Sequence, residues 1–292
     1  MNELKIHFLL NERVHPEPNP IFARAMALLE QRGFAVTSGI PEEALLCPDR
    51  IGARHDLYVL KSQTELALSV AGVVHDRGGR FLNPYPACAI AQNKITAASR
   101  LAAAGVPVPR CWVTAEFARL RWLAAERAIV VKPYRGHRGE SVLVAHGPDD
   151  LQGLKLGDRP MLVQEFIPGE GGDLKIYVVG SHVFGVRKEF SSESFRATGV
   201  PVTVSAQVRD IALRCGRAFG MGLYGLDIIE GHDGPVVVDF NHSPGFRGVP
   251  DAAPLIAAHV EDVLHGRARL PAKPPALECA ACWTRRLQEV PA

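Results

Sequence analysis

Oxygen-bearing side chains gather in one stretch of the chain, LYGLDIIEGHDGPVVVDFNHSPGFRGVP (223–250). It reads as two strands joined by the turn GHDG, with Asp227 in the first strand and Asp239 and Asn241 in the second. Residues two apart in a strand share a face, and antiparallel pairing brings Asp227 beside the other two. Two carboxylates and an amide oxygen are hard ligands that suit Mg²⁺ bound together with phosphates. The alternative for so short a motif is a surface hairpin with solvated acids.

A lysine and a glycine-rich loop form a second candidate site. The strand-like run AIVVKPY carries Lys132, and the loop RGHRGES (135–141) follows with Gly136 and Gly139. Glycines let backbone N–H groups approach phosphate oxygens closely, and the lysine places an ammonium beside them. Neither GxxxxGK[ST] nor a GxGxxG fingerprint after the first strand is present. A glycine-rich hairpin without a ligand is the alternative.

Three further residues are candidates for holding a substrate. Lys61 ends the apolar run DLYVLK, and ligands of parallel α/β sheets bind at the carboxyl ends of strands. Ser243 and Arg247 lie in the loop SPGFRG, which glycine and proline shape directly behind the oxygen cluster. For Lys61, a solvated strand end is the alternative.

Composition excludes several classes of function. The chain has 292 residues, 47% of them apolar and 22% charged, which allows two domains with real cores. A net charge of +2 implies no broad basic face for nucleic acid. The absence of a long apolar run and of a signal-peptide pattern predicts a cytoplasmic protein that makes no membrane contact. The six cysteines are scattered and expected to be reduced, and the CxxC of Cys279 and Cys282 lacks partners for a zinc site.

Alternating strands and helices organise the first part of the chain. Strands are expected at 4–10, 56–61 and 80–83, with helices between them, which indicates a small parallel α/β domain. A helix beginning at Asn93–Lys94 and ending at Gly105 follows. The elements expected after it are helices at 115–126, 203–220 and 255–264 and strands at 161–167, 173–180 and 182–190.

The order of these motifs resembles the ATP-grasp superfamily over residues 84–265. The series runs NK…T, VVKP with its glycine-rich loop, QEFI, DLKIYVVG, VRK, FRATG, LDII and VDFNHSPG. The resemblance implies an ATP-grasp fold, α+β in the grasp part, behind an α/β domain. The expected units are an N-terminal domain (1–92), an ATP-grasp domain (93–270) with a lid (106–167) and a metal-binding subdomain (168–270), and a linker and tail (271–292).

The resemblance also implies roles for individual residues. Nucleotide contacts would come from Lys94 and Lys132 on the α- and β-phosphates, Gly136 and Gly139 in the mobile loop, the adenine hinge Gln164, Glu165, Phe166 and Ile167, and Asp173 near the ribose. Cations near the transferring phosphoryl group would be Lys175, Arg187 and Arg196. Asp227, Asp239 and Asn241 would hold two Mg²⁺, with Mn²⁺ as a substitute. Family members often have Glu at the Asp239 position, and the shorter Asp changes the bridging geometry.

Two neighbouring groups of the superfamily are similar to this chain. RimK-like carboxylate–amine ligases join small carboxylates to amines through an acyl phosphate, releasing ADP and phosphate. Inositol trisphosphate 5/6-kinases share the fold, and a cation cluster for their acceptor is available in Lys175, Arg187, Lys188, Arg196 and Arg247. A nucleotide-binding module without turnover is the third alternative. We expect the ligase, acting on small molecules, with a homodimer as the default assembly.

Overall fold

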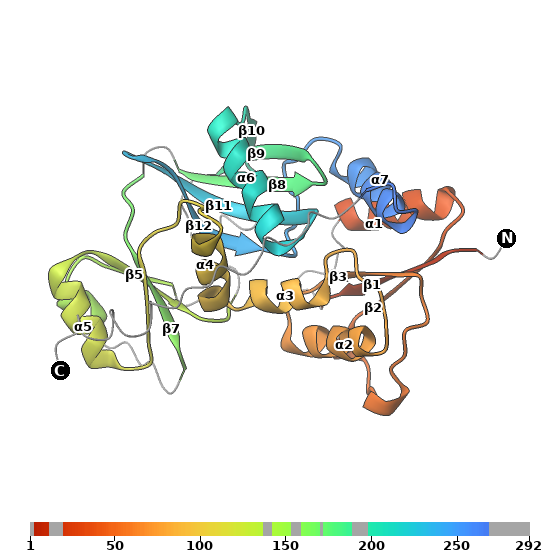
Figure 1. The fold of residues 1–292 in the computed structure, drawn as a ribbon, viewed down its shortest axis with the longest axis horizontal. Coiled ribbons are helices and arrows are strands. Elements are labelled where there is room, and N and C mark those ends of the chain that lie inside the picture. The colour runs from red at the N-terminus through yellow and green to blue at the C-terminus, as the bar shows by residue number, and fades with distance from the viewer. Residues whose placement is uncertain are drawn as a thin grey trace.

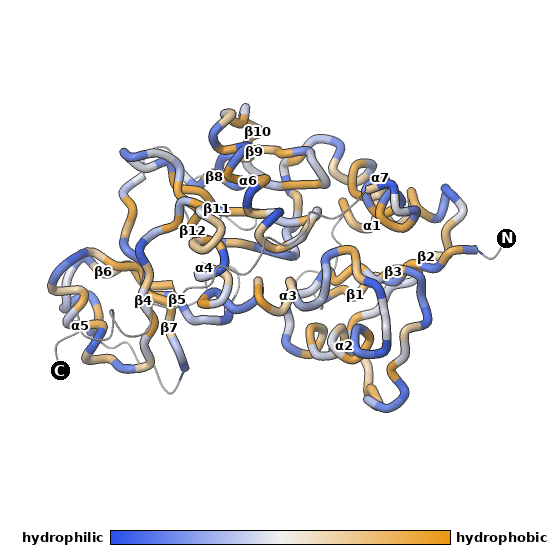
Figure 2. Tube along the Cα trace, in the orientation of Figure 1, coloured by the Kyte–Doolittle hydropathy of each residue, from blue (hydrophilic) through white to orange (hydrophobic). Residues whose placement is uncertain are grey.

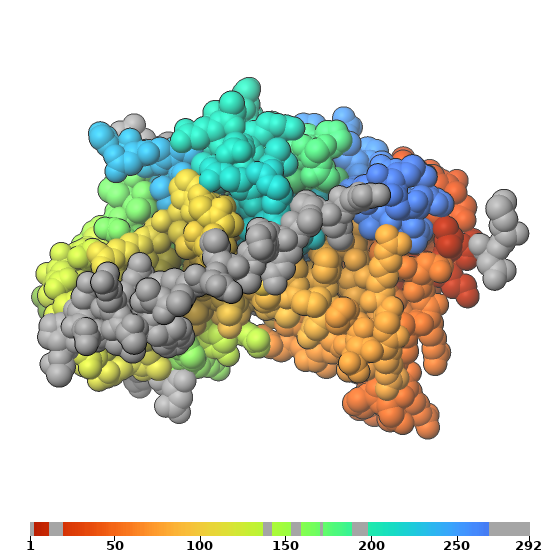
Figure 3. All heavy atoms as spheres, in the orientation of Figure 1, coloured from red at the N-terminus to blue at the C-terminus, as the bar shows by residue number. Residues whose placement is uncertain are grey.

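The computed structural model describes residues 3–11, 20–136, 142–152, 159–169, 172–188 and 198–268. Within these ranges the strands form three sheets that follow one another along the molecule (Figure 1). In Figure 3 the lid lies at one end, the N-terminal domain at the other, and the central sheet with its helix between them. No helix in the described ranges is long and apolar enough to span a membrane.

The N-terminal sheet is parallel, as the sequence predicts, with the order β2-β1-β3. Its two faces are covered by different helices, because Phe8 packs with α1 and Leu60 packs with α2. The elements are β1 (Lys5–Leu10), α1 (Pro20–Gln31), β2 (Ala35–Gly39), η1 (Pro41–Glu43), η2 (Pro48–Arg50), β3 (Leu57–Lys61) and α2 (Glu65–Asp76).

The strand expected at 80–83 is reduced to a single bridge between Phe81 and Tyr58. Pairing ends there because the Asn83 side chain turns into the protein and bonds to the central sheet, and because Pro84 starts a helix that the sequence did not predict. That helix is α3 (Tyr85–Gln92), and α4 (Lys94–Ala103) follows directly. Asn93 caps α4 by accepting hydrogen bonds from the N–H groups of Ile95 and Thr96.

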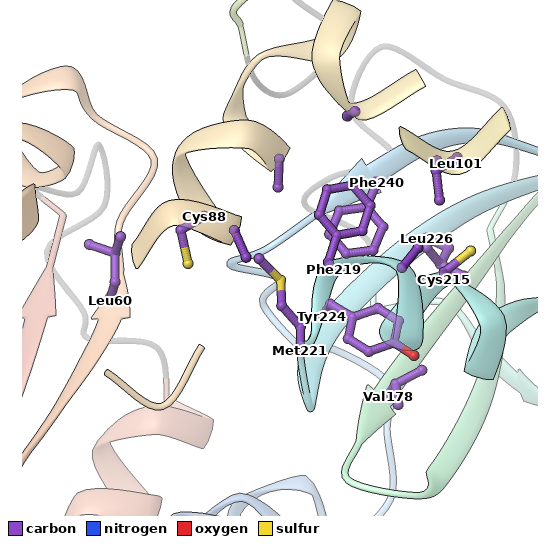
Figure 4. Packing of buried hydrophobic residues seen from close by; sticks show 14 of the residues in the cluster. Leu60, Cys88, Leu101, Val178, Cys215, Phe219, Met221, Tyr224, Leu226 and Phe240 are labelled. Atoms are coloured by element: carbon purple, nitrogen blue, oxygen red, sulfur yellow. The ribbon is translucent and has the colours of Figure 1, made fainter. Parts of the chain in front are cut away.

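The central sheet is antiparallel, with the order β10-β9-β8-β11-β12. Figure 4 shows one face of it packed against α6: Phe219 stacks on Phe240 at 4.0 Å between ring centroids, and Tyr224 lies beside Phe240 at 5.3 Å. The Tyr224 hydroxyl donates to the Ala212 carbonyl at 2.8 Å, which satisfies this buried polar group. The elements are β8 (Asp173–Val179), β9 (His182–Lys188), β10 (Val200–Val202), α6 (Ala206–Phe219), β11 (Leu223–Gly231) and β12 (Gly234–Asn241).

The lid sheet has the order β4-β7-β5-β6 and is also antiparallel. One face buries Ile129, Val131 and Val163 against α5, and Figure 2 shows the hydrophobic character of these strands. The other face carries Lys132 and Gln164, because neighbours along a strand point to opposite sides. The elements are β4 (Cys111–Thr114), α5 (Phe117–Glu126), β5 (Ile129–Pro133), β6 (Leu143–Ala145), η3 (Pro148–Leu151) and β7 (Met161–Glu165).

The last described helix, α7 (Ala252–Leu264), packs on α1 at the opposite end of the sequence. Arg32 pairs with Glu261 at 3.0 Å, and the Arg80 guanidinium donates to the carbonyls of Val263 and Leu264. The N-terminal domain and α7 therefore share one core. The domain boundary at residue 92 stays a prediction.

The cysteines that the structure describes, Cys47, Cys88, Cys111 and Cys215, are free thiols, as expected. Burial raises the pKa of Cys88 to about 12, so this thiol is a packing residue rather than a nucleophile. Cys279 and Cys282 lie outside the described residues.

Candidate active site

The β11–β12 hairpin brings the three predicted oxygen ligands onto one face. Asp227 lies directly opposite Asp239, and Gly225 lies opposite Asn241. The register shifts after Asp227, so that Ile228 pairs with Val237 and Val238 is the extra residue of a β-bulge. The bulge keeps Asp239 on the face of Asp227 while Val237 points into the core.

Two lysines balance these carboxylates. Lys175 Nζ lies 2.7 Å from Asp227 Oδ2 and 2.6 Å from Asp173 Oδ2, and Lys94 Nζ lies 2.5 Å from Asp239 Oδ1. Burial alone opposes ionisation of Asp239, but Lys94 and Lys132 outweigh it and hold the pKa of Asp239 below its ordinary value. Burial likewise disfavours the charged form of Lys175, but Asp227 and Asp173 outweigh it and raise the pKa of that lysine. Asp239 and Lys175 are therefore charged at neutral pH, whereas burial and the neighbouring Asp227 raise the pKa of Asp173.

The lid contributes Lys132 to the same cluster. Its ammonium donates to the Val238 carbonyl at 3.0 Å, the carbonyl of the bulge residue. Burial, together with Lys94, lowers the pKa of Lys132, although Asp239 and Asp227 act in the opposite direction. The Lys94 N–H donates to the Tyr134 carbonyl at 2.7 Å, which ties the start of α4 to the end of the lid strand. Both predicted phosphate lysines therefore lie next to the acidic hairpin.

These residues fit a divalent cation held jointly with phosphate oxygens. No group of three or more His, Cys, Asp or Glu side chains in the described ranges is placed to hold a metal ion. The available donors are two carboxylates and one amide oxygen, with cationic side chains around them. Such a set is typical of magnesium, which keeps some ligands from water and phosphate, and not of a zinc site built from protein ligands alone.

Strand β7, where the adenine hinge is expected, carries a polar side chain, and two backbone amides at its end are engaged in hydrogen bonds. Gln164 is buried on the Lys132 face, where its Nε2 lies 3.9 Å from Cys111 Sγ. The Glu165 N–H donates to the Arg110 carbonyl at 2.9 Å, and the Phe166 N–H donates to the Ala128 carbonyl at 3.0 Å. Register places the exposed Val113 and Val144 on the Lys132 face as well.

Arg187 does not join the cluster. It pairs across β8 with Leu174, whose side chain faces the apolar core, and its guanidinium binds Glu230 at 2.5 Å. The next residue, Lys188, lies opposite Asp173 and is buried on the site face. The expected contact between Arg187 and the transferring phosphoryl group thus finds no support here, because one position along a strand reverses the direction of a side chain. From the sequence, Lys188 is a candidate only under the kinase alternative. Its position in β9, counted forward from the turn at 180–181, would have placed it opposite Asp173.

Two other expected residues fall outside the described residues, Gly139 and Arg196. Gly136 ends the described part of the lid loop with φ 159°, an extended backbone. Arg135, just before it, pairs with Glu65 at the start of α2. The glycine-rich loop therefore begins in contact with the N-terminal domain.

The substrate candidates lie where the N-terminal domain meets the end of β12. Lys61 Nζ donates to the Ser243 carbonyl at 2.8 Å and to its hydroxyl at 3.0 Å, and it lies 5.1 Å from the centre of the Phe22 ring. Tyr177, which the sequence did not single out, lies on the Lys175 face and packs on Phe246. Burial and the negative charge of Asp227 raise the pKa of Tyr177 to about 12, while Lys175 and Arg247 act against this rise. Arg247 is therefore close enough to Tyr177 to act on its charge state.

Comparisons with known proteins identify the family of the chain and its fold. The model of the RimK-like ATP-grasp domain matches residues 91–260. A probable alpha-L-glutamate ligase of Xanthomonas campestris pv. campestris is 30% identical over 205 residues, covering 62% of this chain and 69% of the relative. The RimK domain ATP-grasp protein of Sphaerobacter thermophilus superposes with a TM-score of 0.69 at 21% identity, over 87% of this chain and 98% of that one. The ATP-grasp ligase PsnB, solved with a minimal precursor, Mg and ADP, gives 0.62 at 20% identity, over 88% and 97%.

Proposed function

Because the chain belongs to the RimK-like ATP-grasp family and is an ATP-grasp ligase, we propose that it joins a small carboxylate to an amine through an acyl phosphate. A carboxylate oxygen of the acid attacks the γ-phosphorus of ATP, and the bond from that phosphorus to the β-phosphate oxygen breaks to release ADP. The amine nitrogen then attacks the acyl carbon, the bond to phosphate breaks, and the nitrogen loses a proton. The products are an amide, ADP and inorganic phosphate.

The observation that carries this proposal is the charge array on one face of the central sheet. Lys175 between Asp173 and Asp227, and Lys94 on Asp239, alternate in sign within hydrogen-bond distance, and Lys132 reaches the same strand from the lid. Phosphoryl transfer needs positioning and cations around spreading negative charge more than it needs a nucleophile on the protein. The array supplies positioning and cations, because ion-pair partners fix the orientation of its side chains.

Each member of the array would act at a different part of the nucleotide. Lys94 and Lys132 would exchange their present partners for the α- and β-phosphates, and Lys175 and Lys188 would face the γ-phosphate. ATP-grasp ligases use ATP and Mg²⁺, and the cation supplies neutralisation of the charge that builds between the β- and γ-phosphates. Asp227, Asp239 and Asn241 would hold it, and two ions are proposed. The Arg247 guanidinium would hold the acid beside the γ-phosphate.

The name of the glutamate ligase relatives favours amino acids as substrates. An amino acid offers a carboxylate for activation or an amine for the second step, and both groups are small and charged. Arg247, Tyr177 and Lys61 at the end of β3 combine two cations with a phenol, which suits a compact anion. We therefore propose an α-amino acid as one of the two substrates.

A turnover screen tests the proposed function. Purified protein with Mg²⁺ and ATP is incubated with pooled amino acids and small carboxylic acids, with hydroxylamine added as a trap. Acyl phosphates react with hydroxylamine to give hydroxamates, so ADP and hydroxamate are expected together, with acid-dependent yield. Formation of ADP only with polyol or inositol phosphate pools, and no hydroxamate, would establish the kinase alternative and refute the ligase.

A further inference from the structure

Three consecutive residues of the N-terminal domain contact three consecutive residues at the end of β12. Lys61 binds Ser243, the Ser62 carbonyl lies 3.2 Å from His242 Nε2, and Gln63 Nε2 donates to Asn241 Oδ1 at 2.5 Å. The two segments therefore run antiparallel and are joined by side chains rather than by a strand ladder. The last of these contacts ends on an expected metal ligand.

The orientation of the two amides follows from their chemistry. Asn241 Oδ1 also accepts the backbone N–H of Ser243 at 2.8 Å. Only an oxygen can accept from that N–H, so the atom is Oδ1, and the Gln63 atom that faces it must be the donor Nε2. An amide oxygen has two lone pairs, and both are engaged here. A cation that uses Asn241 must therefore displace one donor.

Gln63 is the donor that can leave. The Ser243 N–H belongs to the backbone three positions from the buried Phe246 and is fixed by the turn itself, whereas the Gln63 amide sits on a side chain with three rotatable bonds. The contacts of Lys61 and Ser62 do not involve expected metal ligands. They would therefore hold the two segments together after the hydrogen bond from Gln63 to Asn241 breaks.

We propose that Gln63 is a positioning residue that competes with the magnesium ion for Asn241 Oδ1, so that binding of magnesium and nucleotide releases the Gln63 amide. The inference rests on the cation assignment made with the proposed function. It makes the N-terminal domain sensitive to the state of the nucleotide site through one hydrogen bond.

The test is the affinity for ADP with and without Mg²⁺, measured by titration calorimetry. Gln63→Met keeps the length of the side chain and removes the donor, so it is expected to lower the Kd of ADP in Mg²⁺ by about two- to tenfold, the range for one net hydrogen bond. In EDTA the Kd of ADP is expected to match that of the wild type, because Gln63 touches a metal ligand and not a phosphate lysine. Gln63→Ala is made in parallel and serves if the methionine variant does not fold.

Two controls separate this inference from the assignment beneath it. Gln152→Ala removes an amide of the same kind from the exposed lid surface and is expected to change neither Kd. Asn241→Ala is expected to weaken ADP binding only in Mg²⁺. Suppose that Asn241→Ala has that effect, but the Gln63 variants bind ADP in Mg²⁺ no more tightly than the wild type. The competition by Gln63 is then refuted, and the cation assignment stands. If Asn241→Ala has no effect, the cation assignment and the inference fail together.

Discussion

The two faces of the central sheet are made by the same strands and have opposite chemistry. One face packs Leu174, Ile176, Leu226 and Phe240 into the core with α6. The other carries Asp173, Lys175, Asp227 and Asp239, each within hydrogen-bond distance of an opposite charge. The first face stabilises the fold by burial, whereas the second has to be held in place by pairing. Substitutions at neighbouring positions should therefore separate stability from catalysis.

Phe240→Ala is expected to have the largest effect, on stability. The ring is buried between Phe219 and Tyr224, so its loss leaves a cavity and costs about 3–5 kcal/mol of the free energy of unfolding. Urea unfolding followed by circular dichroism measures it. ADP formation per folded molecule should be retained at low temperature, and a variant as stable as the wild type would show that this face does not carry the core.

Asp239→Asn, one residue earlier, is expected to act on catalysis instead. Loss of the charge removes an expected metal ligand and the partner of Lys94, so kcat for ADP formation should fall by about 10²–10³-fold. The thermal transition should lie near that of the wild type, because the side chain is not part of the core. Wild-type turnover in this variant would refute the metal assignment.

His259 extends the comparison to a polar group inside an apolar layer. The ring is buried in α7 with no hydrogen-bond partner for Nε2, and burial lowers the pKa of His259 to about 4 from 6.5, with Asp262 opposing and His182 adding to the shift. Between these two values the unfolded chain binds a proton that the folded chain does not, so the free energy of unfolding falls as the pH falls. The contribution of His259 at about pH 5 is about 2 kcal/mol less than at about pH 7.

Urea unfolding of His259→Leu at these two pH values isolates this contribution. The variant should lose about 2 kcal/mol less than the wild type on acidification. His242 and His7, whose pKa values burial also lowers to about 4, titrate in both proteins and cancel in the difference. An unchanged pH dependence would mean that His259 is protonated to the same extent in both states.

Substitutions of Arg187 and Lys188 give the smallest expected effect. They compare the two faces of the central sheet at adjacent positions of β9. Lys188→Met should lower kcat/KM for ATP by about tenfold, because it removes a buried cation next to Asp173. Arg187→Met removes a guanidinium that binds Glu230 on the other face, and the loss there should be smaller. Steady-state kinetics measures kcat/KM for ATP in both variants. A larger loss in Arg187→Met than in Lys188→Met would support the expectation that Arg187 lies near the transferring phosphoryl group.

Sequence patterns succeeded where the interaction is local. The spacing of two residues predicted that Asp239 and Asn241 share a face of β12. Hairpin geometry alone then brought Asp227 to them. The cap at Asn93 and the stop at Gly105 likewise depend on a few adjacent residues.

Features that depend on distant partners were not predictable. The bulge at Val238 depends on how the neighbouring strands of the sheet fit together. The contact of Gln63 with Asn241 joins segments 178 residues apart, and no pattern in either segment indicates it. The short edge strands β4 and β10 were missed because their burial and pairing come from neighbouring strands.

The packing of α7 on α1 has a consequence for synthesis of the chain. Arg32 and Glu261, which pair across this interface, are 229 residues apart, so the part of α1 that α7 covers stays exposed until nearly the whole described chain has left the ribosome. The N-terminal domain is therefore synthesised first, but its core is completed only when α7 has been made. A stop codon just before α7 would leave the nascent N-terminal domain with an open hydrophobic flank, exposed to chaperones and proteases.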